Sequence, residues 1–160
     1  MNHFAETYAR IRRTRRVLFS YCESLPPELY IRHIPKLGGH SMRNLHVHVA
    51  ECYQWWLAEF PFDTKVAYAD KSSYGDVAAV RKLFTRADRA VAAFAAKYDH
   101  APHDAIACIA RRRPQMRGTT FTAQWLFTHT TTHEFHHKGQ IVLLGRYLGY
   151  PPPDTDLVED

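Results

Sequence analysis

THTTTHEFHHKGQ, residues 128–140, is the stretch around which this chain is organised. On a helix His129, His133 and His137 lie one turn apart along a single face, and Gln140 completes the row. Two neutral imidazoles at positions i and i+4 can chelate one divalent ion, and imidazole suits zinc, nickel, copper or iron better than calcium or magnesium. The spacing therefore predicts a metal site, with a merely polar helix surface as the alternative. Apolar side chains on the same row favour the metal site: Leu126, Ile141 and Leu144.

Apolar residues recur at helical spacing in four segments of the chain. Ser41 and Thr122 are suited to cap the second and fourth helices, and Pro61 and Gly149 to end them. Between residues 100 and 120 the pattern breaks, so we expect a short irregular or β-hairpin excursion before the last helix. Four helices of comparable length predict an all-α four-helix bundle. The predicted helices span residues 3–24, 42–60, 75–98 and 122–149.

The second predicted helix offers a further histidine to the site. His48 lies beside Leu45 and Cys52 on the side expected to face inward, whereas His46 points about 160° away. His48 is therefore the better candidate for a third ligand. Taken alone, His48 would be a hydrogen-bonded core histidine and Cys52 a small apolar filler.

Arg15 interrupts the apolar stripe of the first predicted helix. A charge on the core-facing side must either extend to solvent or meet a partner in a polar site inside the bundle. We favour a slightly shifted stripe with an exposed arginine. In the other case Arg15 would belong to the functional site.

Composition bounds the class of protein. The 160 residues, 46% hydrophobic and 23% charged, predict a single domain over residues 1–160. Cys22, Cys52 and Cys108 form no C-x-x-C pair, which favours a reducing compartment without a disulfide framework. The start of the chain lacks the apolar core of a signal peptide, and no run of about 18 apolar residues occurs. We therefore expect a cytoplasmic protein with no membrane partner.

The net charge of +5 is concentrated in two arginine clusters. Such clusters can be solvated helix faces, dock an anionic small molecule, or neutralise nucleic-acid phosphates. No nucleic-acid recognition motif accompanies them, so a nucleic-acid partner is the least favoured of the three. The clusters are Arg10, Arg12, Arg13, Arg15 and Arg16, and Arg111, Arg112, Arg113 and Arg117.

Three segments resemble the signatures of the DinB/YfiT-like metalloenzyme family: SMRNLHVHVA at 41–50, HEFHHKGQI at 133–141 and LGYPPPDTD at 148–156. The resemblance implies a DinB-like four-helix bundle with down-up-up-down connectivity, and frequent homodimers. It also implies a divalent metal held by three histidines, which match His48, His133 and His137. Lys138 stands where the family usually has arginine, which keeps the charge.

The resemblance implies an activity as well, because characterised members of this family include S-transferases and an isomerase that use bacillithiol, mycothiol or a similar small thiol. A three-histidine site leaves positions open, and a cation there stabilises the thiolate, which is the nucleophile in S-transfer. We therefore expect a thiol-dependent S-transferase acting on a small electrophile, with zinc or nickel as the metal. A metal-dependent hydrolase and a non-enzymatic metal-binding or DNA-associated stress protein are the alternatives.

Four other residues receive roles around this expected site. His129, Gln140 and Cys52 are expected to line the pocket or to support the ligands. Arg15 is the candidate for docking an anionic thiol carrier.

The same letters also fit a metalloprotease. HEFHH, residues 133–137, matches H-E-x-x-H, in which two histidines bind zinc and Glu134 would be the general base. Only 23 residues follow His137, and they include three consecutive prolines, which leaves little chain for a peptide-binding architecture. In the DinB-like interpretation Glu134 supports the ligands or lies at the surface.

The second and fourth helices carry more aromatic residues than one inward stripe can hide. Some of them are expected at a symmetric homodimer interface, unless they pack under the long loops. These residues are Tyr53, Trp55, Trp56, Trp125 and Phe127.

Overall fold

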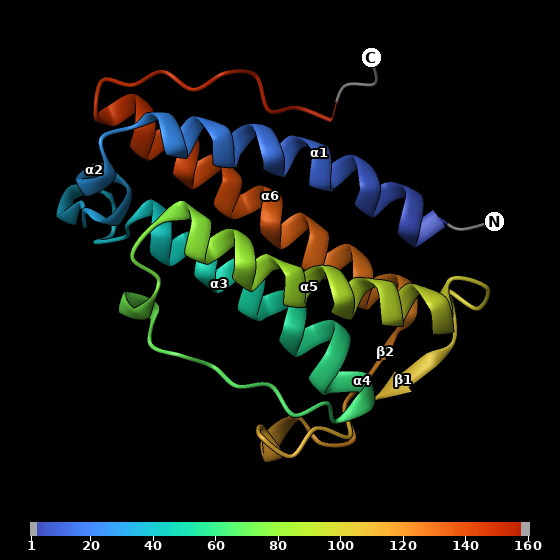
Figure 1. Cartoon of the computed structure of the whole chain (residues 1–160). Coiled ribbons are helices and arrows are strands. Elements are labelled where there is room, and N and C mark those ends of the chain that lie inside the picture. Colours follow the sequence, from blue (N-terminus) through green and yellow to red (C-terminus); the bar gives the residue numbers. More distant parts are fainter. Residues whose placement is uncertain (1–2, 158–160) are drawn as a thin grey trace.

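The computed structural model describes residues 3–157, and four long helices in that range form a bundle. Helix α3 packs against α5 and α6, and α1 packs against the same two helices. Figure 1 shows α1 and α6 running in one direction and α3 and α5 in the other. The predicted all-α bundle is confirmed, and its connectivity is down-up-up-down. The helices are α1 (His3–Ser24), α3 (Met42–Gln54), α5 (Val77–Tyr98) and α6 (Ala123–Tyr147).

Side-chain caps fix where these helices begin. The Ser41 hydroxyl accepts a hydrogen bond from the Asn44 amide at 3.2 Å, and the Thr122 hydroxyl accepts one from the Trp125 amide at 3.1 Å. Both predicted N-caps are confirmed. Helix α5 begins two residues later than predicted because Asp76 caps it.

The end of α3 differs from the prediction. The helix continues through a π-helical turn, η2 (Trp55–Glu59), into a last short turn, α4 (Phe60–Phe62). Pro61 lies directly after the π-helical turn, and the helix runs on past it to Phe62. The chain leaves the helix at Asp63, which adopts a left-handed conformation with φ of 51°. Pro61 is therefore not the residue that stops the helix.

Smaller elements connect the helices. A short helix, α2 (Pro27–Ile31), lies between α1 and α3, and the chain after α4 runs back along the bundle to reach α5 (Figure 1). This crossover allows α3 and α5 to lie parallel. Before α6, β1 (Ala105–Ala107) pairs antiparallel with β2 (Thr120–Thr122), with Ile106 opposite Phe121. The predicted hairpin excursion is confirmed.

The aromatic residues that suggested a dimer interface lie mostly inside. Tyr53, Trp55 and Phe127 are at most 5% exposed, whereas Trp125 is 40% exposed. The guanidinium groups of Arg112 and Arg113, from the loop between β1 and β2, cover the Trp55 ring at 5.1 and 4.4 Å. The alternative, packing under a loop, therefore holds for Trp55, whereas Trp125 remains exposed. Homodimerisation stays a prediction.

Two further expectations concern the whole chain. The three cysteines Cys22, Cys52 and Cys108 are free thiols. Within residues 3–157, no helix is both long and apolar enough to span a membrane.

Candidate metal centre

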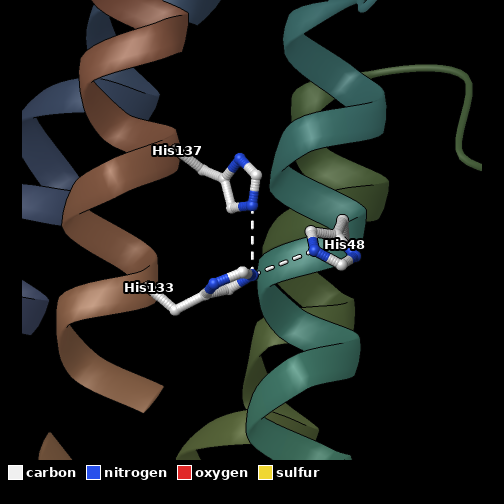
Figure 2. Close-up of side chains that lie close together, drawn as sticks. All are labelled: His48, His133 and His137. Atoms are coloured by element: carbon white, nitrogen blue, oxygen red, sulfur yellow. Dashed lines mark hydrogen bonds between the residues drawn. The ribbon is translucent and has the colours of Figure 1, made fainter. Parts of the chain in front are cut away.

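Three imidazoles converge between two facing helices. His48 extends from α3, and His133 and His137 extend from adjacent turns of α6 (Figure 2). The Nε2 atom of His133 lies 2.9 Å from Nε2 of His48 and 3.1 Å from Nε2 of His137. The antiparallel packing of α3 on α6 brings residues 85 positions apart into this cluster.

The donor geometry fits a single divalent ion. Two nitrogens that are each about 2.0–2.1 Å from one ion lie roughly 2.9–3.4 Å apart at coordination angles of about 90–109°. The two Nε2 separations around His133 fall in this range. One ligand atom from each residue lies within 4.8 Å of the others, and no other such group occurs in residues 3–157.

The protonation states also fit a cation. The Nδ1 atom of His137 lies 2.6 Å from Oε1 of Gln140, so Nδ1 carries the proton and Nε2 presents its lone pair. Burial, reinforced by the neighbouring imidazoles, lowers the pKa of His48 and of His133 to about 4. Burial also lowers the pKa of His137, although the Gln140 hydrogen bond opposes this shift. Near neutral pH the cluster is therefore uncharged and rich in lone pairs, which a cation would stabilise.

His46 does not occupy the outward position expected for it. It is 3% exposed, and its Nδ1 atom lies 3.1 Å from the Tyr30 hydroxyl. Its ring packs against Phe19 and Phe84, so it faces the α1 and α5 side of the bundle. Both sides of α3 are buried, and the prediction that only the His48 side faces inward was wrong.

Behind the histidines lies a buried ion pair that joins α1 to α6. Arg15 donates to both carboxylate oxygens of Glu134, at 2.6 and 2.7 Å, and the Tyr53 hydroxyl donates to Glu134 at 2.5 Å. Arg15 also donates to Asp88 at 3.2 Å and to the hydroxyl of Tyr8 at 3.2 Å. Burial by itself lowers the pKa of Arg15, but the Glu134 carboxylate raises it well above the usual value. The pair therefore stays charged inside the bundle.

This ion pair corrects the interpretations of Arg15 and Glu134. Arg15 is 5% exposed and engaged with Glu134, so it is neither a surface arginine nor free to dock an anionic carrier. Glu134 is 7% exposed, so it is not a surface residue. Its carboxylate is already occupied by Arg15 and Tyr53, and it has no free oxygen to act as the general base of an H-E-x-x-H protease.

The remaining predicted site residues lie around the cluster. Gln140 contacts His137 directly, as described above. The Cys52 sulfur lies 3.6 Å from Nε2 of His48, and burial raises the pKa of this thiol to about 11. His129 lies one turn before His133 in α6, where its ring stacks on Trp125 with a centroid distance of 4.8 Å. It does not belong to the converging group.

A cavity of about 190 Å³ opens beside the cluster. His48 and His133 form one wall, and Arg112 and Arg113 from the loop between the strands form another. The sequence offered the cluster that contains Arg112 and Arg113 as one that could dock an anionic small molecule. It could not assign these two arginines to the histidine site, because a loop position carries no periodicity that would place it in space. The full lining is His48, Glu51, Cys52, Trp55, Trp56, Tyr68, Arg112, Arg113 and His133.

A down-up-up-down bundle with three histidines converging between its second and fourth long helices, beside a cavity, defines a class of metal-binding helical proteins. The model of the DinB family matches residues 1–160, so the chain belongs to the DinB family. The resemblance found in the sequence is thereby confirmed. Among curated proteins no match was found.

Proposed function

We propose that this protein is a divalent-metal-dependent enzyme of the DinB type that transfers a small thiol to an electrophile. The observation that carries the proposal is the convergence of three neutral imidazoles, two of which, His48 and His133, line a cavity large enough for part of a small molecule. Structural sites close all four positions with protein ligands, whereas catalytic sites keep one open. Within residues 3–157 the group offers three ligands, which is the pattern of an open site.

His48, His133 and His137 are the proposed ligands. Their lowered pKa values keep all three in the neutral form that binds metal. Gln140 orients the His137 ring by accepting from Nδ1. A bound divalent cation would supply charge that stabilises a thiolate at neutral pH. Zinc or nickel is the proposed metal, since imidazole ligands and a thiol suit both.

The lining of the cavity supports the proposed transfer of the thiol to a small electrophile. Cys52, Trp55 and Trp56 give the cavity apolar and aromatic surface beside His48. Such surface restricts water around a reacting thiolate and can bury the body of a small electrophile. Cys52 itself stays a thiol, because burial raises its pKa to about 11.

The test has two steps. Metal content is first measured by elemental analysis of protein purified without a histidine tag, for the wild type, His48→Ala and His137→Ala. His136→Ala is the matched control, because His136 is an exposed neighbour on the same helix. We expect the two ligand variants to lose most of their metal and the control to keep it.

Turnover of a chloronitroarene is then followed with and without added N-acetylcysteine. We expect activity that requires the thiol and disappears in His137→Ala but not in His136→Ala. Thiol-independent turnover by metal-loaded protein would overturn S-transfer and indicate a metal-dependent hydrolase. Full metal content in His48→Ala would remove α3 from the site.

A further inference from the structure

The cavity beside the histidine cluster has an unusual charge distribution. Arg112 is already committed, because its Nε donates to Glu59 at 2.9 Å and its guanidinium covers the Tyr68 ring at 3.9 Å. Arg113 is exposed, and no carboxylate within ion-pair distance of it is found in residues 3–157. The cavity therefore has one arginine whose charge no described carboxylate neutralises.

Arg113 is held in place without its N–H groups being used. Its guanidinium lies 4.4 Å from the centroid of the Trp55 ring. A guanidinium that packs on an indole is positioned by the aromatic face, and its N–H edges remain free for a bidentate bond to a carboxylate. Trp55 is itself 2% exposed, so this platform is rigid.

Trp55 links this arginine to the cavity. It lines the cavity that Arg113 borders, and its indole Nε1 is buried without a hydrogen-bond partner. A ligand in the cavity would therefore lie against the Trp55 ring, whose indole N–H signal can report its binding.

The opposing charge in the cavity is Glu51. Burial raises the pKa of this carboxyl, and the positive charges of Lys71 and Arg112 oppose that shift. Lys71, from the 3-10 turn η3 (Lys71–Ser73), shares an adjoining hollow with Glu51 and partly offsets it. Glu59 offsets Arg112, so Arg113 remains as the surplus positive charge. The local charge thus favours an anion even before a metal cation adds to it.

We infer that this cavity binds the carboxylate of a small anionic ligand, with Arg113 as its docking residue, while another part of the ligand reaches the histidine cluster. This inference rests on the proposed function, and for that function the ligand is a thiol that carries a carboxylate. Arg113 takes the role that Arg15 cannot fill. It is a binding residue and lies outside the group of metal ligands.

The test compares two thiols that differ at the carboxyl group, which is charged in one and methyl-esterified in the other. Zinc-loaded protein is titrated with N-acetylcysteine and with its methyl ester, and binding is followed by the indole N–H signal of Trp55 in two-dimensional NMR spectra. Trp55→Phe assigns that signal. The variant is Arg113→Met, and the matched control is Arg117→Met, an exposed arginine of the same loop that does not line the cavity.

We expect the acid to bind wild-type protein more tightly than the ester and to shift the Trp55 signal. Arg113→Met should weaken binding of the acid about tenfold, the loss expected for one charge-assisted pair, and leave the ester unchanged. Arg117→Met should change neither. Equal affinity of acid and ester for the wild type would overturn the inference. So would an equal loss of acid binding in Arg113→Met and Arg117→Met, because that loss would reflect general charge alone.

A third ligand separates this inference from the proposed function. N-acetylalanine keeps the carboxylate and lacks the thiol. Arg113-dependent binding of N-acetylalanine, with no gain from the thiol in N-acetylcysteine, would support the anion site and overturn thiol activation. Metal-dependent binding of both thiols that ignores Arg113 would support thiol activation and overturn the anion site.

Discussion

Replacing Glu134 by Gln should destabilise the metal-free protein strongly. The carboxylate accepts from Arg15 at 2.6 and 2.7 Å and from Tyr53 at 2.5 Å, and all three side chains are buried. The substitution leaves the Arg15 charge buried inside the bundle. It also places an amide N–H₂ group opposite the N–H and O–H donors of Arg15 and Tyr53. Breaking a buried pair in this way costs about 3–5 kcal/mol.

The structure places the expected cost near the lower end of that range. Asp88, 3.2 Å from Arg15, remains as a partial partner after the substitution. We therefore expect a loss of about 3 kcal/mol in the free energy of unfolding. For a chain of this size the loss corresponds to a fall in Tm of roughly 6–12 °C.

Urea unfolding in the presence of a chelator measures the effect. Glu23→Gln is the matched control, because Glu23 pairs with Arg81 at 2.7 Å on the exposed surface. Pairs of that kind contribute about 0–1 kcal/mol. A loss in Glu134→Gln no larger than that in Glu23→Gln would refute the reasoning.

A double variant distinguishes a lost partner from general damage to the core. Arg15→Met combined with Glu134→Leu removes both charges and keeps apolar volume. It should recover much of the stability that Glu134→Gln loses, because replacing a buried pair by apolar residues is often neutral or stabilising. A double variant as unstable as Glu134→Gln would show that packing, and not an orphaned charge, is the cause.

Three further predictions follow from individual residues. Burial and the neighbouring imidazoles lower the pKa of His48 and His133 to about 4, below the ordinary value of 6.5, so the unfolded state binds more protons between these values. Stability of the metal-free protein should therefore be highest above pH 6.5 and fall towards pH 4, as measured by urea unfolding across that range; a flat profile would contradict it. Gly145→Ala should destabilise the protein by about 1–3 kcal/mol, because a Cβ there would lie 1.9 Å from the Tyr21 hydroxyl. Gly139→Ala, on the same helix, should stabilise the protein slightly, because a Cβ there meets nothing within 4 Å. Calorimetric Tm values of both variants test this, and a lower Tm for Gly139→Ala than for Gly145→Ala would contradict it. The homodimer predicts twice the chain mass in light scattering, and a monomeric mass at every concentration would exclude it.

Sequence alone determined the local features of this protein. The i, i+4 spacing of His133 and His137 places both on one face of a helix wherever that helix packs, since 3.6 residues complete a turn. Capping at Ser41 and Thr122 is likewise decided within a few residues, because the side chain bonds an amide of the first helical turn. The hairpin before α6 was predictable because the helical pattern breaks there.

Tertiary structure decided which distant residues meet. Sequence periodicity predicted that one side of α3 faces inward, but α3 contacts both α5 and α6, so His46 is buried as well as His48. A helix that is buried on two sides has no single polar face from which its orientation can be read. His48 was predicted to be a ligand because it lies beside Leu45 and Cys52 on the expected inward side. Only the packing of α3 against α6 shows that His48 reaches α6.

For the same reason, the sequence could not predict that Arg15 meets Glu134 or that the loop arginines lie beside the histidine site. Arg15 and Glu134 are 119 positions apart, and Arg15 looked anomalous alone because a buried charge has meaning only with its partner. Arg113 belongs to a loop, whose path depends on the surfaces that it crosses rather than on a repeating pattern. The sequence determined the chemistry that each helix can offer, whereas helix packing and the loop path decided which groups share a site.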